Sequence, residues 1–495
     1  MYAFMNEKQR SNHSLGSARL KSSEGLPGSV RPAAIYTHGL MSLLVAACIV
    51  TGTVPLLAQE TPLTISQAVR RALDRYPAIR VSLEQVSSAA AEINLVRASY
   101  LPRADFVAQL NRATRNNVSG LLLPQSVIST VSGPVLGPDR IANAWGSALG
   151  VTVSWEPFDF GLRKENLNAA EATRMRAEKG VAVTRLQIGT AAADAFLTIL
   201  AAQHSVRAAQ AGVDRARVIY QVADAFVQAK LRPGVEASRM RAELALAETQ
   251  VIQAEQSVKV ARAALAQFLD MPSPDLSIEP GPLLQAPPNP NLSVGSLDEH
   301  PRVQEQVAAE EEIKARERAL ERSFFPRFSL QGMTYARGTG WQADGTAGGI
   351  GAGLGPNTQN WAFGMTVTFP AFDFQSLRAR KEIEIHRERA QVGRYDQVFR
   401  ELQAQSEKAK AALEGARRVA ENTPFQLEAA RAAEQQSTAR YKAGLGTIVE
   451  VADAERLLTQ AEIDDSLARL NVWRAMLALA AAQGDLSPFL QETGK

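Results

Sequence analysis

Cysteine is almost absent from this chain of 495 residues, in which Cys48 is the single example. One cysteine cannot form a disulfide within its own chain. Histidine is also scarce: beyond the N-terminal segment only His204, His300 and His386 occur, far apart in the sequence, so we expect no metal site of the zinc type. The glycines of 345–355 do not form a G-x-G-x-x-G pattern, and we find no catalytic constellation. We therefore predict a protein that is not an enzyme and uses no cofactor.

An excess of one charge is missing from most of the chain. The sequence has 54 basic and 51 acidic residues, of which residues 1–58 contain five and two, so 49 of each remain in the rest. A body without net charge or a basic run gives no electrostatic reason to bind nucleic acid. We predict no nucleic-acid partner.

Long apolar runs are confined to the N-terminal segment. A basic leader is followed by the apolar residues 41–58. This order is typical of a cleaved export signal, which we predict over residues 1–58. Two alternatives stay open, namely an N-terminal membrane anchor and a lipoprotein acylated on Cys48, since residues 45–48 loosely fit a lipoprotein cleavage box. No later run reaches 18 apolar residues, so we expect no transmembrane helix in the exported body.

The rest of the chain is an internal duplication. The segment Ser99-Tyr-Leu-Pro-Arg103 recurs as Ser323-Phe-Phe-Pro-Arg327, and residues 150–160 recur as residues 364–374. Seven prolines between Pro272 and Pro290 mark the joint between the two copies. We predict a first repeat over 59–271, a proline-rich connection over 272–293, a second repeat over 294–485 and a C-terminal tail over 486–495.

The sequence of each repeat predicts the order helix, strand, strand, long helix, shorter helix. The first helices are expected over 70–100 and 294–324, each ended by a proline. After Asp159 and Asp373, helical composition is expected to run without a break to about residues 230 and 441. About 70 residues at 1.5 Å rise give a rod of roughly 105 Å. The shorter helices are expected over 236–270 and 449–484.

Aromatic residues, only 6% of the chain, gather around four strand segments with alternating apolar and polar side chains. The segments are 104–112, 147–155, 328–337 and 361–369. Each is about as long as a tilted strand that crosses a bilayer. The alternative is a soluble antiparallel sheet that packs its apolar face on helices.

Four strands are too few to close a membrane barrel, for which eight is the usual minimum, and lipid does not tolerate open strand edges. The chain is therefore expected to oligomerise. Three copies supply twelve strands, whereas two copies would give a barrel too narrow to lie over a wide helical tube. We predict a homotrimer in contact with outer-membrane lipid.

In their duplicated order, these features make residues 60–485 similar to the TolC family of outer-membrane efflux proteins. The residues that carry the resemblance are Leu63-Thr-Ile-Ser-Gln-Ala-Val69, Tyr76-Pro77, Phe158-Asp-Phe160, Phe372-Asp-Phe374 and the stretch from Tyr441 to Ala454. The resemblance implies a mainly α fold, in which a trimeric α-barrel of long coiled-coil helices in the periplasm is topped by a twelve-stranded β-barrel in the outer membrane.

The resemblance also implies a function and partners. It implies the outer-membrane channel of a tripartite efflux or secretion system, which exports small molecules by passive conduction from a periplasmic adaptor and an inner-membrane pump. The alternatives are an exit duct for type I protein secretion and a periplasmic coiled-coil structural protein.

The resemblance also assigns candidate site residues. It implies that the two helix-to-helix turns are tips on which the adaptor docks, and glycines in these turns allow the chain to reverse direction tightly. The tip residues are Leu231, Arg232, Pro233 and Gly234 in the first turn, and Gly444, Leu445, Gly446 and Thr447 in the second. The first tip departs from the family pattern, because Arg232-Pro233 replaces a stretch of small residues. Aromatic residues of an expected membrane girdle are Trp145, Trp155, Phe158, Trp361, Phe363, Phe369 and Phe372.

Two acidic residues follow the second tip. Glu450 and Asp453 are three apart on the expected helix and share a face. The resemblance implies that they narrow the periplasmic entrance as a gate, with six carboxylates in a trimer. The local alternative is a helix cap, because Thr447-x-x-Glu450 fits a capping box.

Overall fold

The computed structural model of the chain describes residues 62–114, 143–284 and 296–494, apart from residues 343, 345 and 371. The predicted signal segment with Cys48 and most of the proline-rich connection lie outside these residues. All described residues belong to one compact unit.

The same order of elements occurs twice. The first copy contains α1 (Ile65–Arg75), α2 (Pro77–Ala98), β1 (Arg103–Thr114), β2 (Asn143–Phe158), α4 (Leu162–Gln228) and α5 (Gly234–Leu269). The second contains α6 (Pro301–Arg322), β3 (Arg327–Thr339), β4 (Thr358–Thr368), α7 (Phe374–Lys442) and α8 (Ile448–Gln483), and is followed by α9 (Ser487–Glu492). Three short 3₁₀ turns, Ser273–Asp275, Gly281–Leu284 and Leu297–Glu299, lie between α5 and α6.

Prolines decide where α2 and α6 begin. The first helix was predicted as one element, but it is divided at Tyr76, because Pro77 cannot continue the hydrogen-bond ladder and instead begins α2. Pro301 begins α6 in the same way, and the His300 ring caps this helix by accepting from the Arg302 backbone N–H at 3.1 Å. The prediction of a single helix over 70–100 was therefore wrong.

The two long helices, α4 with 67 residues and α7 with 69, are as predicted in length. However, the prediction that helical composition runs without a break overlooked Pro424, which lies inside α7. A proline removes one backbone donor from the ladder, yet α7 continues through it. The neighbouring Thr423 is buried and donates its hydroxyl proton to Asp465 of α8 at 3.1 Å, so packing on α8 holds the helix where its own ladder is interrupted.

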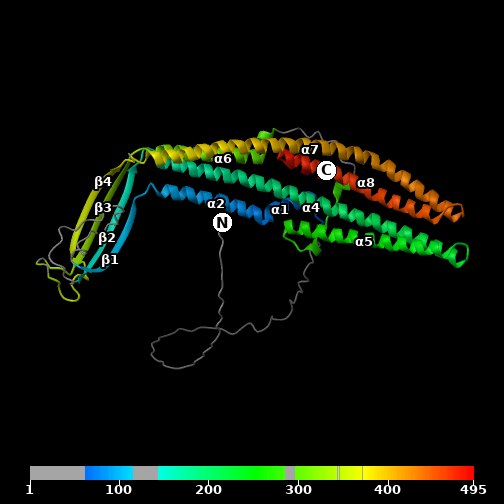
Figure 1. Cartoon of the computed structure of the whole chain (residues 1–495), viewed down its shortest axis with the longest axis horizontal. Coiled ribbons are helices and arrows are strands. Elements are labelled where there is room, and N and C mark those ends of the chain that lie inside the picture. The colour runs from blue at the N-terminus through cyan, green and yellow to red at the C-terminus, as the bar shows by residue number, and fades with distance from the viewer. Residues whose placement is uncertain are drawn as a thin grey trace, which may run out of the picture. The chain divides into compact units, whose positions relative to one another are not determined.

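The helices pack side by side around α4, which contacts α2, α5, α6 and α8, while α7 packs on α6 and α8 (Figure 1). The largest apolar core joins α1, α4, α5, α8 and α9, and its fully buried members include Phe196, Trp473 and Phe489. One 18-residue window of α4 is apolar enough to cross a membrane by length and composition, and half of it is buried in the chain.

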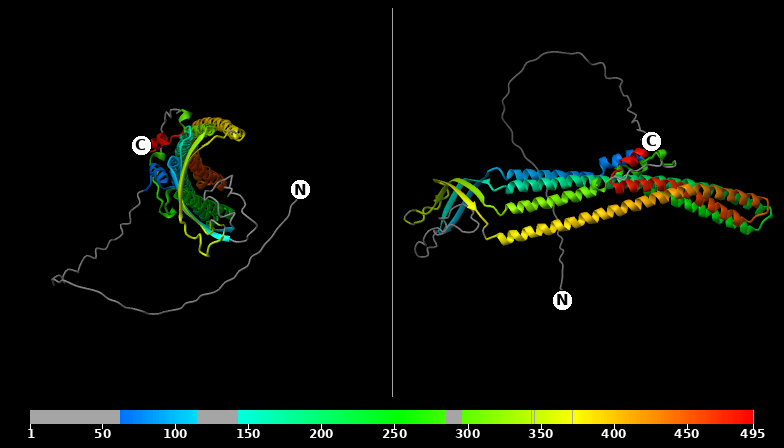
Figure 2. Two further views of the ribbon diagram at one scale, coloured as in Figure 1. Left: turned by 90° about the vertical axis from the view of Figure 1, so that its left-hand side faces the viewer. Right: turned by 90° about the horizontal axis from the view of Figure 1, so that it is seen from above.

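The four strands form one antiparallel sheet in the order β1-β2-β3-β4, with β1 and β4 at its edges. They form a curved layer beyond the ends of the helices (Figure 2). The pairing places Gln109 opposite Ala148, Ala148 opposite Arg337, and Arg337 opposite Thr358. Residues directly opposite one another point to the same face of a sheet, so this register defines two faces.

The two faces differ in chemistry. One face carries the large apolar side chains, among them Phe106, Leu149, Val151, Trp155, Leu330, Trp361, Phe363 and Met365. The other carries small and polar residues such as Gly150, Thr152, Ser154, Gln331 and Thr366. On the apolar face, Trp361 is 81% and Phe363 70% exposed, so the described helices do not cover it.

Candidate functional site

The two tips connect the long helices to the shorter ones at the end away from the sheet (Figure 1). In the second tip, Gly444 has a left-handed backbone with φ of 77°, as the predicted glycine reversal requires. In the first tip the left-handed residue is Lys230, whereas Gly234 already begins α5. The prediction that glycine makes both reversals was therefore wrong for the first tip, where Pro233 at the N-cap fixes the start of α5.

An apolar side chain projects from each tip. Leu231 is 69% exposed in the first tip and Leu445 is 74% exposed in the second. Arg232 is partly buried because it turns back towards α5, where it lies 3.7 Å from the Glu236 carboxylate. A protein that binds the tips would therefore contact two exposed leucines rather than the charge of Arg232.

The two candidate gate residues lie in the first two turns of α8. Thr447 caps this helix: its hydroxyl oxygen accepts from the Glu450 backbone N–H at 3.4 Å, and its hydroxyl donates to Glu450 Oε1 at 3.1 Å. Asp453 is exposed, and the guanidinium of Arg456 lies 3.9 Å from its Oδ1. Glu450 therefore takes part in the cap, whereas Asp453 has no such role and keeps its carboxylate open to solvent.

A link between the two helical hairpins, α4–α5 and α7–α8, was not anticipated from the sequence. Tyr441, in the last turn of α7, is fully buried and donates its hydroxyl proton to Glu236 Oε2 of α5 at 2.9 Å. The guanidinium of Arg232 lies 5.5 Å from the centre of the tyrosine ring. Burial and the bond to Glu236 raise the pKa of Tyr441 to about 12, so the hydroxyl stays protonated at neutral pH and remains a donor. The available signal was an aromatic residue in the last turn of α7, directly before the tip.

Replacing Tyr441 with phenylalanine should loosen the tips. A hydrogen bond to a carboxylate contributes about 1.5 kcal/mol or more, so its loss should favour separation of the hairpins roughly tenfold. We expect trypsin to cleave at Lys230 and Lys442 about tenfold faster in the folded Tyr441→Phe variant. The matched control is Tyr220→Phe, since the Tyr220 hydroxyl has no hydrogen bond among the described residues. Equal cleavage rates in the wild type and the Tyr441→Phe variant would contradict the link.

Ion pairs join the helices above the tips. Arg215 of α4 contacts Glu455 at 2.9 Å and Glu462 at 3.0 Å, both on α8. Arg456 of α8 reaches across to Glu243 of α5, with Nε 3.0 Å from Oε2. Burial raises the pKa of Glu455, and the bond from Arg215 offsets this only in part. These pairs connect α4, α5 and α8 into one unit near the tips.

A groove of about 690 Å³ runs between α4, α5 and α8 in the same region. Small residues of α4, namely Ala209, Gly212 and Ala216, line it together with Met240 and Leu246 of α5. Asp453 also lines it, together with the Glu243–Arg456 ion pair. The groove combines an apolar lining with charge, beside the exposed tips.

The strand-to-helix corner between β2 and α4 is held by a buried carboxylate. Asp159 accepts hydrogen bonds from the backbone N–H and the Nε of Arg163, both at 2.8 Å, and Arg163 donates to the Ser99 carbonyl at 3.1 Å. Burial alone would raise the pKa of Asp159, but the Arg163 bonds outweigh it and lower the pKa. The corner therefore ties the sheet to the ends of α2 and α4.

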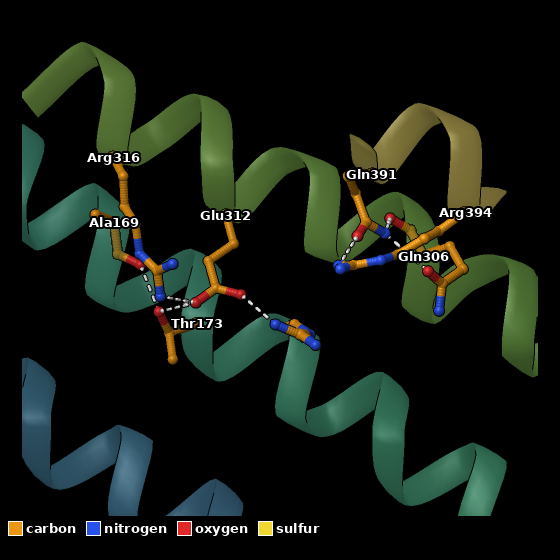
Figure 3. Close-up of polar contacts among 8 residues, drawn as sticks. Ala169, Thr173, Gln306, Glu312, Arg316, Gln391 and Arg394 are labelled. Carbon is orange, nitrogen blue, oxygen red and sulfur yellow. Dashed lines mark hydrogen bonds and ion pairs between the residues drawn. The ribbon is translucent and has the colours of Figure 1, made fainter. Parts of the chain in front are cut away.

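A second buried carboxylate lies between α4 and α6. Glu312 of α6 is 2% exposed and accepts from the Thr173 hydroxyl and from Arg176 of α4, both at 3.0 Å, and it also pairs with Arg316 (Figure 3). Two guanidinium groups, each on a half-exposed side chain, thus share one buried carboxylate.

Most of the predicted girdle residues are exposed on or beside the apolar face. They are Trp155, Phe158, Trp361, Phe363, Phe369 and Phe372. Trp145 differs, because it is partly covered and the guanidinium of Arg112 lies 5.4 Å from the centre of its ring. Among the described residues, no group of three or more His, Cys, Asp or Glu side chains could hold a metal ion.

Comparison with known proteins gives one family. The family model described as "Outer membrane efflux protein" matches residues 68–270 and 292–485. Protein CyaE of Bordetella pertussis is 26% identical over 222 residues, which are 45% of this chain and 43% of that protein. The cobalt-zinc-cadmium resistance protein CzcC of Cupriavidus metallidurans is 32% identical over 145 residues, 29% of this chain and 35% of that protein. The matched parts span less than half of either curated relative.

A solved structure gives the same fold. A membrane protein from Pseudomonas aeruginosa superposes with a TM-score of 0.69 at 20% identity, over 85% of this chain and 90% of that one. The predicted fold class, with long helices, four antiparallel strands per chain and an internal duplication, is confirmed. The number of copies in the assembly stays a prediction.

Proposed function

Because this chain belongs to the outer membrane efflux protein family, we propose that it is the outer-membrane channel subunit of a tripartite export system, through which small molecules leave by passive conduction. Three copies form the channel. Their twelve strands close a barrel in the outer membrane, and their helices continue it through the periplasm.

The observation that carries this proposal is the uncovered apolar face of the sheet. Exposed Trp361, Phe363 and Phe106 would be costly in water, since each aromatic side chain can bury 150–250 Å² of surface. In a soluble sheet, helices would cover this face. In a barrel, the same face meets lipid and the small, polar face lines the pore. The edges at β1 and β4 are then paired between copies, as lipid requires.

The tips, at the end of the helices away from the sheet, support an adaptor partner. The exposed Leu231 and Leu445 and the nearby groove present an apolar surface with charged margins, as a protein–protein contact needs. We propose that a periplasmic adaptor docks on the tips and connects the channel to an inner-membrane pump. The similarity of part of this chain to the cobalt-zinc-cadmium resistance protein CzcC makes divalent metal ions one substrate class to test beside organic molecules.

Planar lipid bilayers test the conduction directly. Purified protein in detergent, added to one side, should produce discrete current steps of uniform size. The proposal would fail if folded protein, shown by sedimentation to be inserted in proteoliposomes, left them impermeable to small ions. A periplasmic coiled-coil structural protein would instead fail to insert into the proteoliposomes and would produce no current steps.

A further inference from the structure

The polar face of the sheet has an uneven distribution of charge along the strands. Near the helices, the face carries both signs: Arg103 pairs with Asp105 at 3.0 Å, and Arg327 and Glu156 lie at the same end. Charges of opposite sign largely cancel there. This end of the pore therefore has little preference for ions of one sign.

Towards the other end of the strands, Arg337 is the one charged residue that this face carries among the described strand residues. Its position opposite Ala148 and Thr358 places it on the polar face, ten residues along β3 from Arg327. Its side chain is exposed, and no carboxylate of the described residues forms an ion pair with it. Among the described residues, the outer half of the polar face, which is the half away from the helices, thus has an uncompensated positive charge.

We propose that Arg337 makes the outer part of the pore selective for anions. This inference rests on the proposed trimeric channel, in which three copies of Arg337 form a ring at one height of the barrel. A twelve-stranded barrel is about 24 Å across at its backbone. With a screening length of about 10 Å at 0.1 M salt, three guanidinium groups on such a wall influence much of the pore cross-section. Rings of arginine favour anions in other pores.

The consequence for transport is a preference among exported solutes. Small anions, such as carboxylates and phosphates, would be concentrated at the exit, and cations would be depleted there. The candidate acidic ring of Glu450 and Asp453 lies at the opposite end of the helices, so the two rings act in series with opposite signs. The selectivity of the whole channel is their combined effect.

The reversal potential of the channel under a KCl gradient tests the inference. In planar bilayers at low salt, we expect Arg337→Gln to lower the chloride-to-potassium permeability ratio about two- to threefold, and Arg337→Glu to lower it further. Raising the salt should shrink the difference because it shortens the screening length.

Two matched variants separate the charge from other effects. Gln109 is in register with Arg337 on the same face, two strands away, so Arg337→Gln combined with Gln109→Arg should largely restore the wild-type ratio. Arg112 lies on the opposite face, and Arg112→Gln should leave the ratio unchanged.

An unchanged ratio in both Arg337 variants, with normal conductance steps, would overturn the inference and leave the channel proposal intact. Absence of current steps in the wild type would overturn the channel proposal and this inference with it.

Discussion

Replacing both Glu450 and Asp453 with alanine should raise the single-channel conductance several-fold and abolish block by divalent cations. In a trimer, six carboxylates would surround the entrance at the tips. A ring of carboxylates attracts and holds multivalent cations, and the bound cation obstructs the passage of other ions. Asp453 is exposed and its nearest cationic partner is 3.9 Å away, so its charge is available to such a ring. Conductance with and without added Mg²⁺ in planar bilayers measures both effects.

Two variants distinguish a gate from a helix cap. Thr447→Ala removes the cap and leaves both carboxylates, so it should lower stability by about 1 kcal/mol while block by Mg²⁺ persists. Asp464→Ala removes a charge from the same helix, about 16 Å from Asp453, and should also leave the block unchanged. If the double alanine variant keeps wild-type conductance and block, then Glu450 and Asp453 do not form the gate.

Replacing Glu312 with alanine should destabilise the helical part more than replacing any of its exposed acidic neighbours on α6. The carboxylate is buried between Arg176 and Arg316 and also accepts from Thr173. Arg176 and Arg316 are each about half exposed and would be hydrated after its removal, so the cost is that of the lost charged hydrogen bonds, about 1.5–3 kcal/mol. We expect a marked fall in the midpoint of heat-induced unfolding of the detergent-solubilised protein.

The adjacent acid provides the control. Glu311 lies one residue away on α6, its side chain is 56% exposed, and it pairs with Lys314 at 3.4 Å. Such a surface pair contributes at most about 1 kcal/mol, so Glu311→Ala should leave the midpoint almost unchanged. Equal midpoints for the Glu311 and Glu312 variants would show that the buried cluster does not stabilise the helical layer.

The sequence predicts the ends of the helices near the tips and the alternation of the strands well. Expected helices over 236–270 and 449–484 are found at Gly234–Leu269 and Ile448–Gln483. These boundaries are local: a proline at the start of one helix and a threonine cap at the other are visible in the sequence. The two faces of β2 follow from alternation alone, since strand geometry has a strict period of two.

Features that depend on tertiary contacts were missed. Nothing in the charge pattern separates the buried Glu312 from its exposed neighbour Glu311, because burial is decided by the packing of α6 on α4. The continuation of α7 through Pro424 likewise depends on α8, whose Asp465 receives the Thr423 hydroxyl. The bond between Tyr441 and Glu236 joins residues 205 positions apart. For these sites, local propensity carries too little information, and only the fold brings the partners together.

The number of chains in the detergent-solubilised assembly tests the central claim most directly. Light scattering that separates protein from detergent mass, on material extracted from outer membranes, should give three copies per particle and aggregation once the detergent is removed. A single copy that stays monodisperse in buffer without detergent would contradict the account, because one sheet with two open edges and an uncovered aromatic face would then need neither neighbours nor lipid.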